Sequence, residues 1–516
     1  MVKSVKNNIF LIAIVIISTL LILFFSAQKI NYHVDELLTY SLSNSTSSVN
    51  PVPGEKYKSY GEFQKSFLTP SEDTKFNYEN VWKNQANDVH PPFYYAIIHT
   101  ISSFFPGFFS KYIGISINIF FNMFIILLLY KSTLFLTKDK TSAYVTSLFW
   151  AINPGVISDN TFIRMYIMAM FFCLLLSYVH ILKINQLSVK DTKFYLAIFL
   201  VSVTGTLTHY YFLIFAFFLC ALFSLHLLFR KKYKELIAYV GTYVVSSIFV
   251  WTIFPGIYFH IFGGGYRGAE SIGNLKNKTG YLESLKIFLE IVSNNLFGGY
   301  LLFSMILIMG LIAVYFYKNK NHMKNEYVLK IGFLLSPCLF YFLLVSKIAV
   351  YKAERYIQLI YPIIILIFVS LIFFIIKRYL SDKKSIFIIC AILIVMTVSG
   401  YARTCSFEYL ISDSKKAIEL SKQYHDKDVI YIYNASWKIQ TNFLELEQYK
   451  SVTFILFNNL EMLYKNSNNY DDFVLYIDPS IENEEEILNS IVDKYPKIKK
   501  YTKLYNYAYS NVYYFE

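Results

Sequence analysis

The sequence predicts a mostly α-helical polytopic membrane protein, with about 11 transmembrane helices of roughly 20 residues each and a C-terminal α/β domain. Three observations predict this class. Hydrophobic residues make up 55% of the 516-residue chain and charged residues only 16%, which is too apolar for a soluble protein of this length. Short basic loops separate the long apolar runs, and the composition changes after about residue 402. Aromatic residues, at 19%, suit membrane-interface belts.

The first apolar run, 9–28, follows Lys3 and Lys6 and lacks a convincing cleavage site, so we expect an uncleaved first helix. The segment 91–107 is short and begins with two prolines, which predicts a juxtamembrane or re-entrant helix rather than a complete span. The other expected spans are 112–136, 142–157, 162–182, 194–208, 209–229, 236–258, 297–317, 328–346, 357–376 and 384–401.

The net charge of +13 comes mainly from Lys and Arg in alternate loops, a pattern that orients a membrane protein and does not indicate nucleic-acid binding. By the positive-inside rule these loops are cytoplasmic, so the loops 29–111, 259–296 and 347–356 are extracytoplasmic. The candidate functional residues all lie at this outer side. A transporter would instead need a site near the midplane, between repeated halves that the sequence does not show.

Beyond residue 402 the pattern alternates between strands and helices. Short strands are expected at 428–434, 451–457, 471–478 and within 501–515, with helical stretches between them. We therefore divide the chain into a transmembrane catalytic domain, 1–402, which includes the first extracytoplasmic loop, and an extracytoplasmic α/β domain, 403–516. The second domain has no glycine-rich nucleotide loop, and no chemistry is assigned to it.

Asp35 and Glu36 form a carboxylate pair directly after the first helix. Asp35 is the candidate catalytic base, because a carboxylate at the membrane surface can take the proton from an acceptor hydroxyl. The plainer interpretation is a solvated loop carboxylate. Glu36 is the second catalytic candidate; it could hold an acceptor, bind a metal ion or be an ordinary interfacial charge.

The next apolar segment opens with Asp88-Val89-His90-Pro91-Pro92. Proline is favoured at the first turn of a helix, so we expect a helix to begin there, capped by Asp88 or the adjoining backbone. His90 would then lie beside the positive end of the helix dipole, which suits an anionic phosphate. A purely structural cap is the alternative.

Arg164 and Tyr166 open a later span, and His209 lies in a turn between two spans. An arginine fork is suited to a phosphate, and a histidine can donate to a phosphate or position a sugar. The alternatives are an interfacial anchor for Arg164 and a satisfied polar side chain for His209.

Arg355 and Tyr356 stand just before a span that contains Pro362. They are the remaining phosphate-side candidates, for the same reason as Arg164. The alternative for Arg355 is an interfacial anchor or an ion pair with Glu354.

Together, the carboxylate pair, the D-x-H-P-P-x-Y-Y element of residues 88–95 and the two Arg-Tyr elements resemble the GT-C glycosyltransferases. The resemblance covers about 1–400 and is closest to bacterial members akin to protein O-mannosyltransferases and the lipid A aminoarabinose transferase. It implies an integral membrane enzyme that transfers a sugar from a polyprenyl-phosphate donor outside the cytoplasm. It further implies Asp35 as the base of an inverting displacement, with Arg164, His209 and Arg355 near the donor phosphate.

These observations predict a hexosyl- or pentosyltransferase of a bacterial plasma membrane, acting on a cell-envelope glycan, lipid or protein. The partners are the polyprenyl-phosphate sugar, the acceptor and the lipid bilayer, without nucleic acid. No metal site is assigned; a divalent cation is possible at the acidic residues but is not expected to be obligatory. The alternatives are a transporter or flippase of lipid-linked saccharides and an inactive cell-envelope scaffold.

Overall fold

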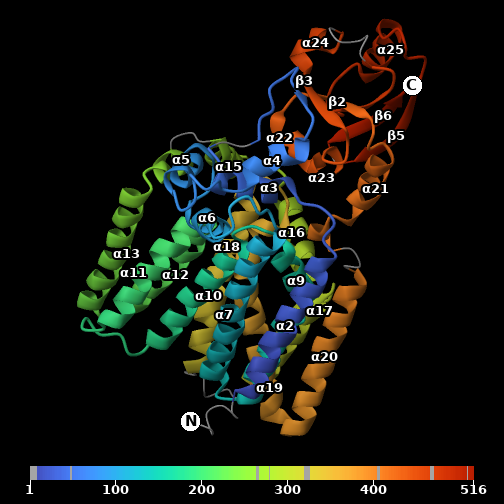
Figure 1. The fold of residues 1–516 in the computed structure, drawn as a ribbon. Coiled ribbons are helices and arrows are strands. Elements are labelled where there is room, and N and C mark those ends of the chain that lie inside the picture. Colours follow the sequence, from blue (N-terminus) through green and yellow to red (C-terminus); the bar gives the residue numbers. More distant parts are fainter. Residues whose placement is uncertain are drawn as a thin grey trace. The chain divides into compact units, whose positions relative to one another are not determined.

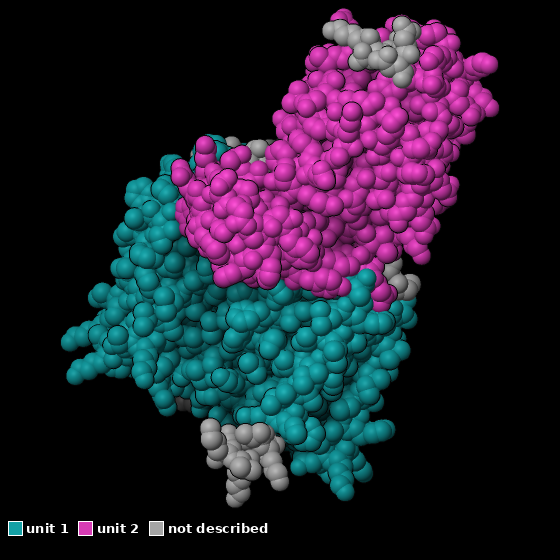
Figure 2. Space-filling view, viewed as in Figure 1, with its two compact units in different colours: residues 1–27, 85–94, 114–407 teal, residues 28–84, 95–113, 408–516 magenta. Residues whose placement is uncertain are grey.

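The computed structural model describes residues 8–46, 49–262, 266–277, 279–318, 326–403, 407–464, 470–507 and 509–516 (Figure 1). The chain divides into two compact units, each assembled from several segments (Figure 2). Unit 1 comprises residues 1–27, 85–94 and 114–407, and unit 2 comprises residues 28–84, 95–113 and 408–516. The structure therefore groups most of the first long loop with the C-terminal segment.

Unit 1 is helical. Its helices are α2 (Ile9–Ala27), α7 (Lys111–Thr137), α8 (Lys140–Ala151), α9 (Pro154–Thr161), α10 (Tyr166–Lys183), α11 (Thr192–Thr208), α12 (Tyr211–Phe229), α13 (Tyr233–Ile253), α14 (Gly256–Ile261), α15 (Tyr266–Lys276), α16 (Tyr281–Phe297), α17 (Leu301–Lys318), α18 (Glu326–Ile348), η1 (Glu354–Tyr356), η2 (Gln358–Ile360), α19 (Tyr361–Tyr379) and α20 (Asp382–Arg403). Helices α5 (Glu79–Asn87) and α6 (Phe93–Ser103), and the first turn of α7, contribute residues to both units.

Within the described residues, eight helices are long and apolar enough to cross a membrane, or up to nine if the bent pair α16–α17 forms one span. The expected count of 11 is not confirmed. The segment expected to span at 142–157 is divided between α8 and α9, of 12 and 8 residues. The break has a local cause, because the Asn153 side chain accepts hydrogen bonds from Gly155 N and Val156 N and so caps a new helix that begins at Pro154.

Two other segments also differ from simple spans. Helix α11 has only 17 residues, and α16 and α17 meet at an angle of 82°. The bend lies at Gly298 and Gly299, whose φ values of +57° and +90° favour glycine. Helix α6 has 11 residues and is about 16 Å long, which agrees with the expectation that 91–107 does not cross completely.

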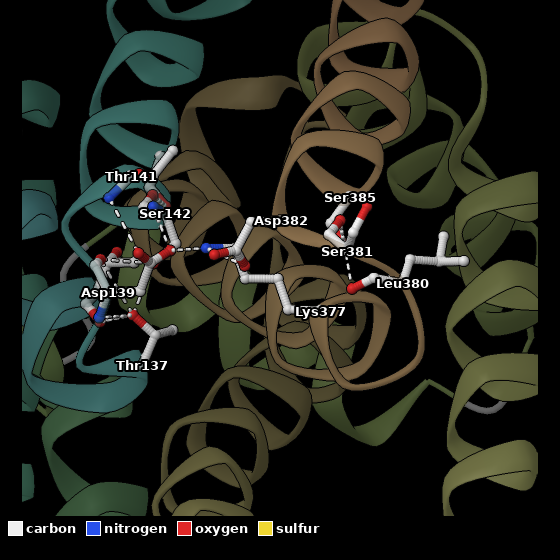
Figure 3. Close-up of polar contacts among 11 residues, drawn as sticks. Thr137, Asp139, Thr141, Ser142, Lys377, Leu380, Ser381, Asp382 and Ser385 are labelled. Atoms are coloured by element: carbon white, nitrogen blue, oxygen red, sulfur yellow. Dashed lines mark hydrogen bonds and ion pairs between the residues drawn. The ribbon is translucent and has the colours of Figure 1, made fainter.

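A polar cluster joins the ends of four helices of unit 1 (Figure 3). Asp139 caps α8 by accepting from Thr141 N and Ser142 N. The same carboxylate receives the Lys377 ammonium at 3.0 Å, from the last turn of α19. Lys377 also lies 3.5 Å from Asp382, which begins α20. These contacts fix α7, α8, α19 and α20 to one another at one end.

Unit 2 is built around a six-stranded mixed sheet with the strand order β1-β3-β2-β4-β6-β5. The central strand β2 pairs in parallel with both β3 and β4, while the other pairings are antiparallel. The strands are β1 (Lys56–Tyr57), β2 (Asp428–Tyr433), β3 (Ser451–Leu456), β4 (Phe473–Ile477), β5 (Tyr501–Tyr507) and β6 (Ser510–Phe515). The four C-terminal strand regions expected from the sequence are present, with 501–515 forming a hairpin.

Helices cover both faces of this sheet. One face carries Ile430, Phe473 and Leu475 and packs against α24 and α25, whereas the other carries Val429, Tyr431 and Val474 and packs against α4, α22 and α23. The helices of unit 2 are α3 (Val34–Asn44), α4 (Tyr60–Leu68), η3 (Glu408–Leu410), η4 (Ser412–Ser414), α21 (Lys415–Gln423), α22 (Ser436–Ile439), η5 (Gln440–Asn442), α23 (Phe443–Leu446), η6 (Phe457–Asn459), α24 (Glu461–Tyr464) and α25 (Glu484–Lys494).

Segments of the first loop are integral to this fold. Strand β1 pairs with β3 through Lys56 opposite Thr453, and Tyr60 of α4 is buried against the second face of the sheet. Asn44, at the end of α3, donates to Leu68 O at 2.8 Å and so fixes α3 to α4. Helix α3, which carries the carboxylate pair, is therefore held by the loop that joins it to β1 and α4.

Candidate functional site

The carboxylate pair lies in the first turn of α3, in a capping box formed with His33. The Glu36 carboxylate accepts a hydrogen bond from His33 N at 2.7 Å, and the His33 ring accepts from Asp35 N at 3.1 Å. Negative charge in a first turn is also stabilised by the helix dipole. The same three residues therefore begin α3 and fix the direction of the Glu36 carboxylate.

Glu36 is fully buried and pairs with Lys29. The Lys29 ammonium lies 2.9 Å from Glu36 Oε2, and the two side chains are 1% and 0% exposed. Lys29 also donates to Tyr409 O. Burial lowers the pKa of Lys29, and the Glu36 charge offsets part of this shift. Because a buried charge needs a partner, this pair anchors the chain after α2 to the first turn of α3.

Asp35 has a different environment from its neighbour. Its side chain is 25% exposed, so solvent or a substrate can reach the carboxylate. His33 Nδ1 lies 3.8 Å from the Asp35 carboxylate and accepts from Asp35 N, so this ring nitrogen carries no proton. Of the two acidic residues, Asp35 is thus the one whose carboxylate is accessible for proton transfer.

The second group of predicted residues lies in unit 1 and forms a hydrogen-bonded chain. His90 Nε2 is 3.1 Å from Arg164 Nη2, and His90 Nδ1 is 2.9 Å from Asp88 Oδ2. A guanidinium can only donate, so Nε2 accepts and the ring proton is on Nδ1, which donates to Asp88. Burial raises the pKa of Asp88, but the hydrogen bonds from His90 and the Val89 backbone and the charge of Arg164 outweigh it and hold the pKa below its ordinary value.

This chain gives the Asp88 side chain a defined partner. Helix α6 begins at Phe93, directly after Pro91-Pro92 as expected, and the Asp88 side chain bonds to His90. Asp88 orients the His90 ring, which in turn supports Arg164. Arg164 is only 3% exposed, and this contact with His90 holds its buried guanidinium in place.

A row of aromatic rings runs from Tyr166, two residues after Arg164, to Tyr356, which follows Arg355. The Tyr166 ring lies 5.4 Å from the His209 ring, which lies 5.3 Å from Tyr211, and Tyr211 lies 5.4 Å from Tyr356. The structure thus brings together Asp88, His90, Arg164, Tyr166, His209, Arg355 and Tyr356 within unit 1, and it holds Asp35 and Glu36 in unit 2.

His209 presents a hydrogen-bond donor. Its Nδ1 accepts from Tyr211 N at 3.1 Å, which places the ring proton on Nε2. Burial lowers the pKa of His209 well below its ordinary value, and the nearby charge of Arg164 acts in the same direction. The ring is therefore neutral, and its Nε2–H has no hydrogen-bond acceptor among the described residues.

Arg355 lies beside a second arginine that sequence reasoning did not select. The Arg355 guanidinium is 5.6 Å from the Tyr356 ring and 5.7 Å from the Tyr351 ring. The Arg267 guanidinium is 4.9 Å from the same Tyr351 ring and pairs with Glu270 at 2.8 Å. The only sequence signal for Arg267 was its place in an outer loop. The Glu354 carboxylate accepts from Asn295.

The described residues contain no group of three or more His, Cys, Asp or Glu side chains arranged to hold a metal ion. The chemistry that this part of the chain offers is that of fixed cations, one neutral imidazole donor and an accessible carboxylate. Fixed donors of this kind stabilise an anion, and a carboxylate accepts a proton.

Neither a protein-family model nor a curated protein sequence matches the chain. Solved structures do match it. The crystal structure of ArnT from Cupriavidus metallidurans bound to undecaprenyl phosphate matches with a TM-score of 0.51 and 9% identity, over 93% of this chain and 96% of that chain. The apo state of the same protein matches with a TM-score of 0.49 and 8% identity, over the same shares of both chains. The chain therefore shares the fold of ArnT.

Proposed function

We propose that the protein is a membrane glycosyltransferase, which transfers a sugar from a polyprenyl-phosphate donor to an acceptor hydroxyl. The observation that carries this proposal is the fold shared, along nearly the whole of both chains, with ArnT bound to undecaprenyl phosphate. The residues support it independently. Unit 1 places the His209 donor and Arg355 along one row of aromatic rings, and the charge of Arg164 acts on His209.

The donor phosphate is the proposed ligand of this row. Two guanidinium groups can each form paired hydrogen bonds to phosphate oxygens, and the His209 Nε2–H can donate one more. Asp88 and His90 position Arg164, while Tyr166 and Tyr356 hold the rings beside His209 and Arg355. As the glycosidic bond breaks, negative charge grows on the phosphate, and these fixed donors stabilise it without reorganising.

Asp35 is the proposed base. The acceptor oxygen attacks the anomeric carbon, its proton passes to the Asp35 carboxylate, and the bond from that carbon to the phosphate oxygen breaks. The polyprenyl phosphate leaves with the bonding electron pair. One base and a direct displacement suffice, which inverts the anomeric centre. Glu36 is a positioning residue, because its carboxylate is occupied by the cap and Lys29.

We place this reaction at the extracytoplasmic face of a bacterial plasma membrane. The basic loops are expected on the cytoplasmic side, and the candidate site residues are expected on the opposite side. The acceptor is a cell-envelope glycan, lipid or protein, and the sugar is a hexose or pentose. The acidic residues could serve as ligands of a divalent cation, but the proposed mechanism needs no metal ion.

A donor titration tests the phosphate role. In proteoliposomes, Arg355→Ala is expected to raise the KM for the polyprenyl-phosphate sugar about 10- to 100-fold, which is the loss of one strong charge-assisted contact. The KM for the acceptor should stay within about twofold, and Arg355→Lys should fall between the two. Arg230→Ala, in the basic turn after α12, is the matched control and should leave both constants unchanged. An unaltered donor KM in Arg355→Ala would remove Arg355 from the phosphate site.

A further inference from the structure

Unit 2 contains a cavity of about 510 Å³ that the proposed transfer mechanism does not use. It is lined by the segment 50–53 of the first loop and by residues 433–437, with Leu456. Tyr433 and Leu456 are the last residues of β2 and β3. The cavity therefore lies at the carboxyl ends of two parallel strands, the edge at which α/β sheets usually bind their ligands.

The topology of the sheet makes this edge open. Strand β2 lies between β3 and β4, and all three run in parallel. The segment after β2 leads to α22 and α23 on one face, whereas the segments after β3 and β4 lead to α24 and α25 on the other. Where successive connections leave toward opposite faces, a crevice forms outside the carboxyl ends of the strands.

The lining is uncharged. Its polar side chains are two amides and a hydroxyl, Asn50, Asn434 and Ser436, beside the aromatic residues Tyr433 and Trp437. The Lys438 ammonium lies 5.9 Å from the centre of the Trp437 ring, but it is paired with Asp478 at 2.7 Å. An anionic ligand such as a nucleotide or a phosphate would therefore find no unpaired counter-charge here.

Groups suited to a neutral, hydroxyl-rich ligand are present. Amide and hydroxyl side chains both donate and accept hydrogen bonds, which matches sugar hydroxyls. Asn50 and Ser436 make no side-chain hydrogen bond to another described residue. The Trp437 side chain is 41% exposed although it is large and apolar, and its ring is held edge-on by Tyr509 at 5.0 Å. A supported, exposed indole offers a flat surface for the C–H face of a sugar ring.

We propose that this cavity binds an uncharged saccharide segment of the acceptor. This inference rests on the proposed glycosyltransferase function and specifies its acceptor as a glycan. A proline-rich peptide, which also binds exposed aromatic grooves, would be expected to make a row of ring contacts. Only Trp437 and Tyr433 carry aromatic rings among the lining residues, and hydrogen-bonding side chains lie beside them.

The test uses the full-length protein in lipid nanodiscs. An array of neutral and anionic oligosaccharides, with a decaproline peptide as the protein-type probe, identifies the ligand class, and calorimetry then measures its Kd. We expect neutral oligosaccharides to bind. Trp437→Ala should weaken this binding at least tenfold, Trp437→Phe should retain most of it, and Asn50→Ala should weaken it several-fold. Asn489→Ala, an exposed amide of α25 remote from the lining, is the matched control.

The outcomes separate this inference from the proposed function. Binding of decaproline or anionic glycans alone, or neutral-glycan binding unaffected by Trp437→Ala and Asn50→Ala, would overturn the saccharide site. Asp35→Asn should bind the oligosaccharide as the intact protein does, because Asp35 does not line the cavity. Trp437-dependent binding without any sugar transfer by the intact protein would overturn the proposed function and the acceptor role together, leaving only a saccharide-binding domain.

Discussion

At the scale of single residues, the adjacent Asp35 and Glu36 show how environment separates two identical functional groups. Glu36 is buried, accepts from the backbone and pairs with Lys29, whereas Asp35 is partly exposed. Sequence analysis named Asp35 as the base and Glu36 as a second candidate, but it could not predict the difference in burial, because that difference arises from contacts with distant segments. Tyr409 O, which receives the Lys29 ammonium, lies 380 positions away.

The buried pair makes a prediction about stability. Glu36→Gln or Lys29→Met alone should cost about 3 to 5 kcal/mol of unfolding free energy, because each leaves the opposite charge buried without its partner. The double variant Lys29→Met/Glu36→Leu should cost less than either single change. The thermal unfolding midpoint in detergent measures this, with Asp35→Asn as a control that should unfold as the intact protein does. Equal stability of the intact protein and both single variants would show that the pair does not anchor α3.

At the scale of elements, local signals were read correctly where they were strong. The prolines at 91–92 predicted the short helix α6, and the β-rich segments after 402 predicted four strand regions. The span count was not confirmed because two breaks lie inside apolar runs. Asn153-Pro154 starts a new helix, and Gly298-Gly299 permits a sharp bend. Both signals are visible in the sequence, but hydropathy averaged over roughly 20 residues hides them.

Other parts of the fold and site carried no readable local signal. Strand β1 has only two residues, and its pairing with β3 joins positions almost 400 apart, as in Lys56 opposite Thr453. Likewise, Arg267 and Arg355 meet at Tyr351 through the packing of unit 1. The arginines and histidines that we propose for the donor-phosphate site were predicted as individual residues. The ring contacts among their neighbours were not predicted.

The Asp139 cluster makes a prediction at this scale. Asp139→Ala removes the α8 cap and the partner of Lys377, so the unfolding midpoint should fall, with about 1 kcal/mol lost from the cap alone. Asp382→Ala is the matched control, since this carboxylate is 79% exposed and lies farther from Lys377. Its effect should be small, because exposed ion pairs contribute little. Thermal unfolding in detergent measures the midpoints of both variants. If the two midpoints fall equally, the stabilisation comes from the ion pairs of Lys377 and not from the α8 cap.

At the scale of the whole molecule, each unit is assembled from segments that are distant in sequence. Unit 2 joins residues 28–84 and 95–113 to 408–516. Its interior contains a polar network in which Tyr476 and Tyr505 donate to the buried Glu445 carboxylate at 3.2 and 3.0 Å. Burial raises the pKa of Glu445 to about 7, although these hydrogen bonds act in the opposite direction. The stability of this unit should therefore depend on pH.

The sign follows from proton linkage. The folded pKa of about 7 exceeds the ordinary value of 4.5, so the contribution of Glu445 is fully present below pH 4.5 and is lost as pH rises through about 7. The total change is about 3 kcal/mol. Hydrogen exchange of β4 and β6 in the full-length protein, corrected for intrinsic chemical exchange, should show decreasing protection from pH 5 to 8. Glu445→Gln should flatten this dependence and Glu447→Gln should not; an unchanged slope in Glu445→Gln would contradict it.

The central claim is sugar transfer from a polyprenyl-phosphate donor with Asp35 as the base. Mass spectrometry of envelope glycans and lipid-linked sugars tests it most directly, in cells with the intact gene, without the gene, and with Asp35→Asn at matched protein level. The account predicts that both defective strains lose one sugar from the envelope and accumulate its polyprenyl-phosphate donor. If Asp35→Asn matches the intact strain while the deletion does not, the protein acts by transport or as a scaffold, and the catalytic account is wrong.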